Sequence, residues 1–232
     1  IIFPGNEVKF GQGVFYRCNS IQDVSIGGDW KSIDFKMFRW SDSLATVTIP
    51  AKIEKIQNMK SLKHLERIHV DVNNAKFTAF EGVLYNKNGD ILYGCPRAYD
   101  GNLKIASATK QITHGALIDC LRITRVDLPE NLISVSFREF SRMAILDEII
   151  FRGELPLYTA KNKNEVFFVL QVLNKNVRII VNKKAKNKFK ETLVQFPGEF
   201  TELDGNVPFK VELDQMPMLK NVIGVKNFAK YE

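Results

Sequence analysis

The chain has 232 residues, 45% apolar and 25% charged, so it can bury a sizeable core and has the charge content of an ordinary folded protein. It has no apolar run of about 18 residues, which excludes a membrane-spanning helix from the sequence as given. The net charge of +7 would suit a polyanionic partner, but the basic excess is concentrated between Lys161 and Lys190. This distribution predicts a local basic patch rather than a general nucleic-acid-binding protein.

Neither the N-terminal residue nor the cysteines determine how the chain is processed or whether it contains disulfides. The sequence opens with Ile1 rather than methionine, as expected of a chain that has lost a leader and equally of a cloned fragment. Cys18, Cys95 and Cys120 form an odd, widely spaced set. This set supports neither a disulfide framework nor a CxxC metal site.

A pattern of apolar residues repeats along the first two thirds of the chain. Ile112, Leu117, Cys120, Ile123, Val126 and Leu128 recur, in the same order and at the same spacing, as Val135, Phe140, Met143, Leu146, Ile149 and Phe151. The same offsets hold in copies that start at Phe10 and Ile33. In a copy that starts at Ile56, the closing apolar residues arrive two positions early. A fixed period of about 23 residues predicts a solenoid of stacked coils.

Each copy ends in a short segment in which inward and outward residues alternate. These segments are Val24–Ile26, Val47–Ile49, Ile68–Val70, Leu103–Ile105, Val126–Leu128 and Ile149–Phe151. Their period of two predicts short parallel strands, one per coil. Pro50 and Pro129 follow two of the strands and are expected to end them. The return segments, which carry Phe15, Phe38, Leu117 or Phe140, are expected to form short helical turns.

Between Val70 and Leu103 the period breaks, and residues 77–96 are expected to form an inserted β-hairpin. Residues 80–85 and 91–96 flank an Asn- and Gly-containing segment, and these residue types tolerate the positive φ of a reversal. Such an insertion either lies at a binding face or braces adjacent coils, and the sequence leaves both readings open.

Beyond Gly153 the spacing loosens. We expect residues 154–194 to form a terminal repeat or cap, with a strand at 177–181 and a helix that places Ala185, Phe189 and Leu193 on one face. Residues 195–232 form a C-terminal extension, in which alternation of Phe209, Val211 and Leu213 suggests a strand. The repeats themselves are assigned to residues 1–153.

A basic run lies within the expected cap helix. It comprises Lys183, Lys184, Lys186, Lys188 and Lys190. The favoured interpretation is the solvated face of an amphipathic helix. The alternative is an electrostatic site for sulfated glycans, nucleic acid or an anionic surface. No aromatic residues are interleaved through the run, which counts against single-stranded nucleic acid.

No arrangement typical of catalysis or of metal binding is present in the sequence. His64, His69 and His114 lack ligand spacing, and the adjacent Asp147 and Glu148 face opposite sides of a strand. We find neither a glycine-rich phosphate loop nor a nucleophile elbow. Cys18 and Cys120 share one repeat position, which favours buried structural thiols. We therefore expect no metal, no cofactor and no enzymatic activity.

The repeat resembles the BspA-type leucine-rich repeat of bacterial surface proteins, notably of the Bacteroides group. The matching residues are Ile112, Ala116-Leu117, Cys120, Ile123 and Val126–Pro129, with Phe15, Cys18 and Leu44–Pro50 in other copies. Gly82–Lys87 with Cys95-Pro96 resembles the family's insert, and Val177–Lys190 resembles its terminal unit. Ser41 and Met143 depart from the pattern at the cysteine position.

The resemblance implies an α/β repeat fold, a right-handed solenoid with its short parallel strands on the concave face. It also implies an extracellular or cell-surface location and a non-enzymatic adhesion module that binds a host or bacterial surface protein or glycan. The alternative is a structural scaffold or spacer with no ligand of its own.

The expected ligand-binding residues are the outward side chains of the strands. They are Asp23, Ser25, Thr46, Thr48, Arg67, His69, Lys104, Arg125, Asp127, Glu148 and Ile150. Their mixed charge suits a polar protein surface better than a uniform polyanion.

Overall fold

The computed structural model describes residues 1–3, 10–11, 13–133, 135, 137–140, 142–153, 178–182 and 222–225. The chain divides into two compact units, Ile1–Asp100 and Gly101–Glu232. The expected helix with Ala185, Phe189 and Leu193, the lysine run and the strand at Phe209–Leu213 lie outside the described residues.

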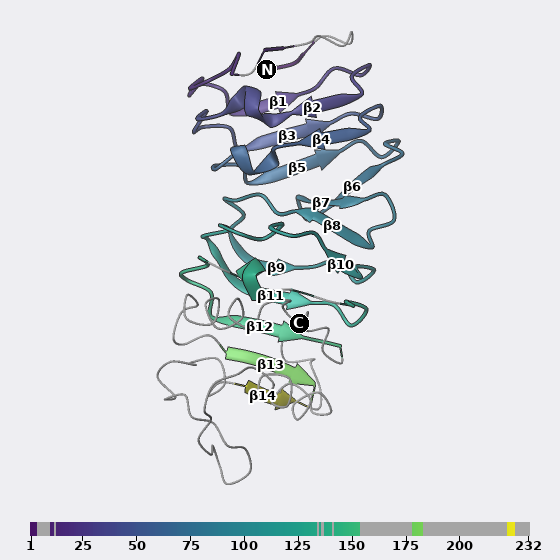
Figure 1. The fold of residues 1–232 in the computed structure, drawn as a ribbon, viewed down its shortest axis with the longest axis vertical. Helices are drawn as coiled ribbons and strands as arrows, with labels where there is room; N and C mark the ends of the chain where they lie inside the picture. Colours follow the sequence, from purple (N-terminus) through teal and green to yellow (C-terminus); the bar gives the residue numbers. More distant parts are fainter. Residues whose placement is uncertain are drawn as a thin grey trace. The chain divides into compact units, whose positions relative to one another are not determined.

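A parallel three-stranded sheet runs through the coils of the first unit. It consists of β1 (Asp23–Ser25), β3 (Thr46–Ile49) and β5 (Arg67–Val70), which lie one above another in that order (Figure 1). Val24 pairs with Val47, one full period along the chain, and Val47 pairs with Ile68, two positions short of a period. Both the period and the shortening of one copy are therefore confirmed.

A second small sheet of the first unit was not predicted. β2 (Ser32–Asp34) pairs in parallel with β4 (Lys55–Gln57). Each strand turns one apolar residue inward, Ile33 or Ile56, and one such residue per strand is too little alternation to detect in sequence. The return segments that follow contain single turns of 3-10 helix, η1 (Phe35–Phe38) and η2 (Met59–Ser61). The helical turn expected for the copy with Phe38 is thus confirmed.

The inward residues of these strands and turns form one apolar core. Val24, Val47, Ile49 and Ile68 come from the strands and are almost completely buried. At its N-terminal end the core closes with an aromatic cluster of Phe3, Phe10, Phe15, Trp30 and Phe38, whose ring centroids lie 5.3 to 6.1 Å apart. No single coil can bury its own apolar side, so this packing between neighbours holds the coils together.

Three antiparallel strands follow the parallel coils of the first unit. β6 (Phe77–Phe80) pairs with β7 (Val83–Asn86), and β7 pairs with β8 (Ile91–Gly94). The reversal between β7 and β8 is organised by Asn86, whose side-chain oxygen accepts the Ile91 N–H at 2.9 Å. Gly89 takes φ +74° in this turn, a conformation that favours glycine.

The second unit contains a parallel sheet of five strands. They lie in the order β9 (Gly101–Lys104), β11 (Ile123–Leu128), β12 (Glu148–Phe151), β13 (Arg178–Asn182) and β14 (Val222–Val225). Leu103, Val126 and Ile149 pair in successive strands, each one full period beyond the last. β10 (Gln111–Ile112) and the 3-10 turn η3 (Phe137–Phe140) lie in the return segments.

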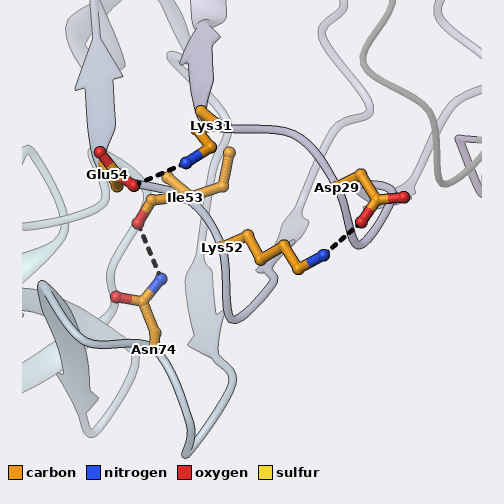
Figure 2. Close-up of polar contacts among 6 residues, drawn as sticks. All are labelled: Asp29, Lys31, Lys52, Ile53, Glu54 and Asn74. Atoms are coloured by element: carbon orange, nitrogen blue, oxygen red, sulfur yellow. Dashed lines mark hydrogen bonds and ion pairs between the residues drawn. The ribbon is translucent and has the colours of Figure 1, made fainter.

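Polar contacts between equivalent positions of successive coils add to the apolar packing. Lys52 pairs with Asp29 at 2.5 Å and Lys31 with Glu54 at 3.2 Å, and Asn74 donates to the Ile53 carbonyl (Figure 2). Both ion pairs join exposed side chains one full period apart and are expected to contribute little. The Asn74 contact is buried, so its contribution is larger.

Candidate binding surface

The outward side chains of β1, β3 and β5 form two rows across the coils of the first unit. One row is Asp23, Thr46 and Arg67, and the second is Ser25, Thr48 and His69. We call these six residues the strand face. Neighbours within a row lie one strand spacing apart, about 4.8 Å, and the rows are separated by two residues of strand, about 7 Å.

The strand face is polar and carries opposite charges at its two edges. Asp23, Arg67 and His69 are exposed, whereas Ser25, Thr46 and Thr48 are half-buried. Among the described residues, no side-chain hydrogen bond or ion pair engages the Asp23, Arg67 or His69 side chain. The charged groups of the face therefore keep their capacity to bind a partner.

The stem of Arg67 is held from one side by the turn between β6 and β7. A side chain at Gly82 would lie 3.3 Å from the Arg67 Cγ, so the glycine backbone packs closely on this stem. Gly82 has φ +83°, which glycine adopts without strain. The arginine is thereby restrained near its Cα, while the residue remains exposed.

Three of the positions expected to be exposed in the second unit are not. Asp127 and Glu148 are buried, and Ile150 is 0% exposed. The expectation of an exposed side chain is wrong for these residues. Lys104 is exposed as expected, and Arg125 is half-buried.

Ion pairs with arginine explain the burial of Asp127 and Glu148, and apolar packing explains the burial of Ile150. Arg152 donates to both carboxylate oxygens of Asp127 at 2.7 Å, and the Arg125 Nε lies 3.8 Å from a Glu148 oxygen. These charges of the sheet are therefore paired with one another. Ile149-Ile150-Phe151 is a continuous apolar run, and such a run is typical of a strand buried on both faces.

His64 and His114 lie beside carboxylates, and the cysteines are wholly or partly buried. His64 lies 3.5 Å from Asp42, and His114 lies 3.6 Å from Glu139. Cys95 and Cys120 are buried and Cys18 is half-buried, and the three form no disulfide. Throughout the described ranges, no group of three or more His, Cys, Asp or Glu side chains is arranged to hold a metal ion.

Sequence reasoning missed a second exposed feature of the first unit. Basic groups lie over aromatic rings where three successive coils turn. The residues are Tyr16, Arg17, Arg39, Trp40 and Lys63. The residue types differ between equivalent positions, so no repeat in the sequence marks them. A partial signal was available in the spacing, because Arg17 and Trp40 are one repeat period apart, whereas Lys63 lies in the shortened copy.

Comparison with protein families decides the assignment of the chain. The model of the BspA type leucine-rich repeat region matches residues 1–83 and 99–207 in six copies. The chain belongs to the BspA-type leucine-rich repeat family. The matched residues leave out 84–98, which contain most of β7 and all of β8. No match was found among curated proteins.

The chain also resembles solved structures of bacterial proteins. A leucine-rich repeat protein from Eubacterium ventriosum is 19% identical with a TM-score of 0.45, and the match covers 72% of this chain and 52% of that one. A leucine-rich cell surface protein from Faecalibacterium prausnitzii is 16% identical with a TM-score of 0.45, over 89% and 65% of the two chains. The pneumococcal vaccine antigen PcpA is 11% identical with a TM-score of 0.42, over 83% and 68%. The chain thus spans about half the length of the Eubacterium protein.

Proposed function

We propose that this BspA-type repeat chain is a non-enzymatic binding module of a bacterial cell surface, and that its strand face recognises a protein. The observation that carries the proposal is the contrast between the two sheets. Among the described residues, the side chains of Asp23, Arg67 and His69 in the first unit make no hydrogen bond or ion pair, whereas Asp127 and Glu148 of the second face arginine side chains. Charged groups with no internal partner are free to pair with another molecule.

A protein suits the strand face better than a polyanionic glycan does. The face carries a carboxylate at one edge and a guanidinium with an imidazole at the other, with hydroxyl groups between them. A uniform polyanion would be repelled at the Asp23 edge. A protein can present opposite charges and hydrogen-bonding groups in the same order.

Family membership supports the proposed location at the cell surface. The described part of the chain contains no helix long and apolar enough to cross a membrane.

The proposal is tested by identifying a partner and then disabling the face. The chain is immobilised and exposed to mucus and extracellular-matrix preparations, and a captured protein is purified for affinity measurements. In Arg67→Glu with His69→Glu, charge is changed on two outward positions of β5. We expect the affinity to fall about tenfold or more, as for loss of contacts in the centre of an interface.

A matched control is available on β4, the second small sheet of the same unit. Lys55→Glu with Gln57→Glu changes two exposed positions with the same spacing and the same change of charge. Its affinity should equal that of the wild type. Equal weakening by both double variants would rule out the strand face, and capture of no protein that survives physiological salt would favour a scaffold or spacer.

A further inference from the structure

A ladder of basic and aromatic side chains follows one corner of the first unit. We call Tyr16, Arg17, Arg39, Trp40 and Lys63 the corner ladder. The Arg17 guanidinium lies 5.4 Å from the Tyr16 ring centroid and the Arg39 guanidinium 5.9 Å from that of Trp40. The Lys63 ammonium lies 4.1 Å from the Trp40 centroid and so reaches across from the next coil.

The backbone stacks these side chains in successive coils. Phe15 and Arg17 donate backbone hydrogen bonds to the Met37 and Arg39 carbonyls at 3.0 and 3.2 Å. Arg17 and Trp40 have positive φ values of 56° and 66°, and the same conformation recurs at Asp119 and Arg142 in the second unit. The left-handed corner is therefore a recurring feature of several coils, and backbone hydrogen bonds place the corners of the first two coils next to each other.

The aromatic residues of the corner ladder are exposed rather than buried in the core. Tyr16 is 48% and Trp40 is 40% exposed, whereas the other tryptophan, Trp30, is 3% exposed in the core. A left-handed backbone position favours glycine or asparagine, so a tryptophan at this position adds strain. Exposed rings offer flat apolar surfaces that can pack against a ligand.

The corner ladder carries three positive charges on exposed side chains, which can contact an anion. Arg17, Arg39 and Lys63 are exposed, and among the described residues no carboxylate pairs with any of them. Lys36 and Lys60, on η1 and η2 of the neighbouring return segments, are also exposed. The nearby carboxylate of Asp42 lies 3.5 Å from His64. This surface is therefore complementary to an anion, unlike the strand face.

We propose that the corner ladder binds an anionic polysaccharide. Arg17, Arg39 and Lys63 come from three successive coils, so their charges can contact several charged groups along one extended polysaccharide. The rings provide faces against which a pyranose can pack, and the guanidinium and ammonium groups bind its sulfates or carboxylates. Single-stranded nucleic acid fits less well, because the corner ladder contains two rings and three cations and so lacks further rings for successive bases.

This site is independent of the proposed protein-binding function, since it uses different residues and a different ligand class. Either proposal can fail while the other holds.

The probe is a heparin-derived octasaccharide, titrated into the full chain at about 0.15 M salt while tryptophan emission is recorded. We expect saturable quenching in the wild type and none in Trp40→Leu, which retains the buried Trp30. This readout excludes octasaccharide bound elsewhere on the basic chain. Absence of quenching in the wild type would overturn the proposal.

Charge reversal then tests the cations of the ladder. Arg17→Glu with Lys63→Glu should raise the Kd from the quenching titration about tenfold or more, as expected from the loss of two charge contacts. The control Lys55→Glu with Lys76→Glu changes two exposed lysines outside the corner by the same charge and should leave the Kd within about twofold. Equal Kd values for both double variants contradict the proposal. If the reversed variant does not fold, Arg17→Gln with Lys63→Gln replaces it.

Two further arms separate the alternatives. An oligothymidylate of the same length that quenches Trp40 at lower concentration than the octasaccharide would identify a nucleic-acid site and refute the glycan. If the stacked Lys63 and Trp40 have a purely structural role, Trp40→Leu lowers the melting temperature and the octasaccharide does not quench the wild type. That result would also refute the glycan site. A neutral dextran oligosaccharide is expected to leave the emission unchanged, and equal binding of dextran would exclude recognition of charge.

Discussion

Asn74 uses every hydrogen-bonding position of its side-chain amide in the interior of the first unit. It is fully buried, and its nitrogen donates to the Pro50 and Ile53 carbonyls at 2.8 and 3.0 Å. Its oxygen accepts the backbone N–H groups of Lys76 and Phe77 at 2.8 and 2.7 Å. One side chain thus joins a coil to the segment that enters β6, with no polar group of the amide left unpaired.

Replacement of this amide by a carboxylate of nearly the same shape removes both donors. In Asn74→Asp, the Pro50 and Ile53 carbonyls lose the amide donor and face a buried acidic group, so we expect the free energy of unfolding to fall by about 2–4 kcal/mol. Urea unfolding followed by circular dichroism measures the change. The neighbouring Asn73→Asp is a matched control on an exposed residue and should stay within about 0.5 kcal/mol. Equal losses in both variants would contradict this role.

The contacts of Ser41 explain why this copy can have serine where the family pattern has cysteine. Its hydroxyl donates to the Phe15 carbonyl at 2.6 Å and accepts the Cys18 N–H at 3.2 Å. A thiol is a weaker donor and acceptor than a hydroxyl. The serine is therefore a functional replacement for cysteine at a turn where the coil needs a small polar bridge.

At the scale of elements, the pair of Asp127 and Arg152 joins two successive strands of the second unit. Asp127 lies on β11 and Arg152 follows β12, and two parallel hydrogen bonds of 2.7 Å connect them. Both side chains are largely buried, with exposures of 9% and 21%. The geometry requires the planar fork of arginine, which presents two donors to one carboxylate.

Arg152→Lys should therefore cost stability although it preserves the charge. A lysine makes at most one strong contact with the buried carboxylate, and we expect a loss of about 1–3 kcal/mol in the free energy of unfolding. Arg142→Lys provides the comparison, because Arg142 pairs with Asp119 at 3.2 Å but is 70% exposed. This exposed pair should change by less than about 0.5 kcal/mol. A similar effect of the two substitutions in chemical denaturation would show that the fork geometry is unimportant.

Across the whole molecule, the sequence was sufficient for the strands that close each copy and for their register, but not for the β2–β4 pair or for exposure on the second sheet. Alternation and a fixed period identify Val24, Val47 and Ile68 as inward residues, because each coil must bury an apolar residue at this strand position. Ile150 was misassigned because alternation was assumed across an apolar run that is buried on both sides. Charge pairing between Asp127 and Arg152 does not follow the repeat period, so the period could not predict it.

The corner ladder was missed for a related reason. Its cations and rings are different residue types in successive coils, one of which is shortened, and Arg17 and Trp40 adopt a left-handed conformation that their residue types do not predict. The period of the apolar residues predicts which residues are buried in the core, but it does not predict which exposed residues form such a surface.

The stability of the whole chain should also depend on pH through Tyr99. Burial raises the pKa of this hydroxyl above its ordinary value, with smaller increases from Glu81 and Cys95 and an opposing effect of Arg67. The unfolded chain therefore loses this proton at a lower pH than the folded chain. The contribution to stability is complete below about pH 10 and is lost as the pH rises through the higher pKa of the folded state.

Tyr99→Phe keeps the aromatic ring and removes the ionisable group, so its stability should decline less steeply over this alkaline range. Urea unfolding at a series of pH values compares the two slopes, and the slopes are informative even if the variants differ in absolute stability. In parallel, tyrosinate absorbance of the folded protein should show a late-titrating component that Tyr99→Phe removes from the six tyrosines of the chain. Parallel slopes together with an unchanged titration curve would show that Tyr99 ionises alike in the folded and unfolded states.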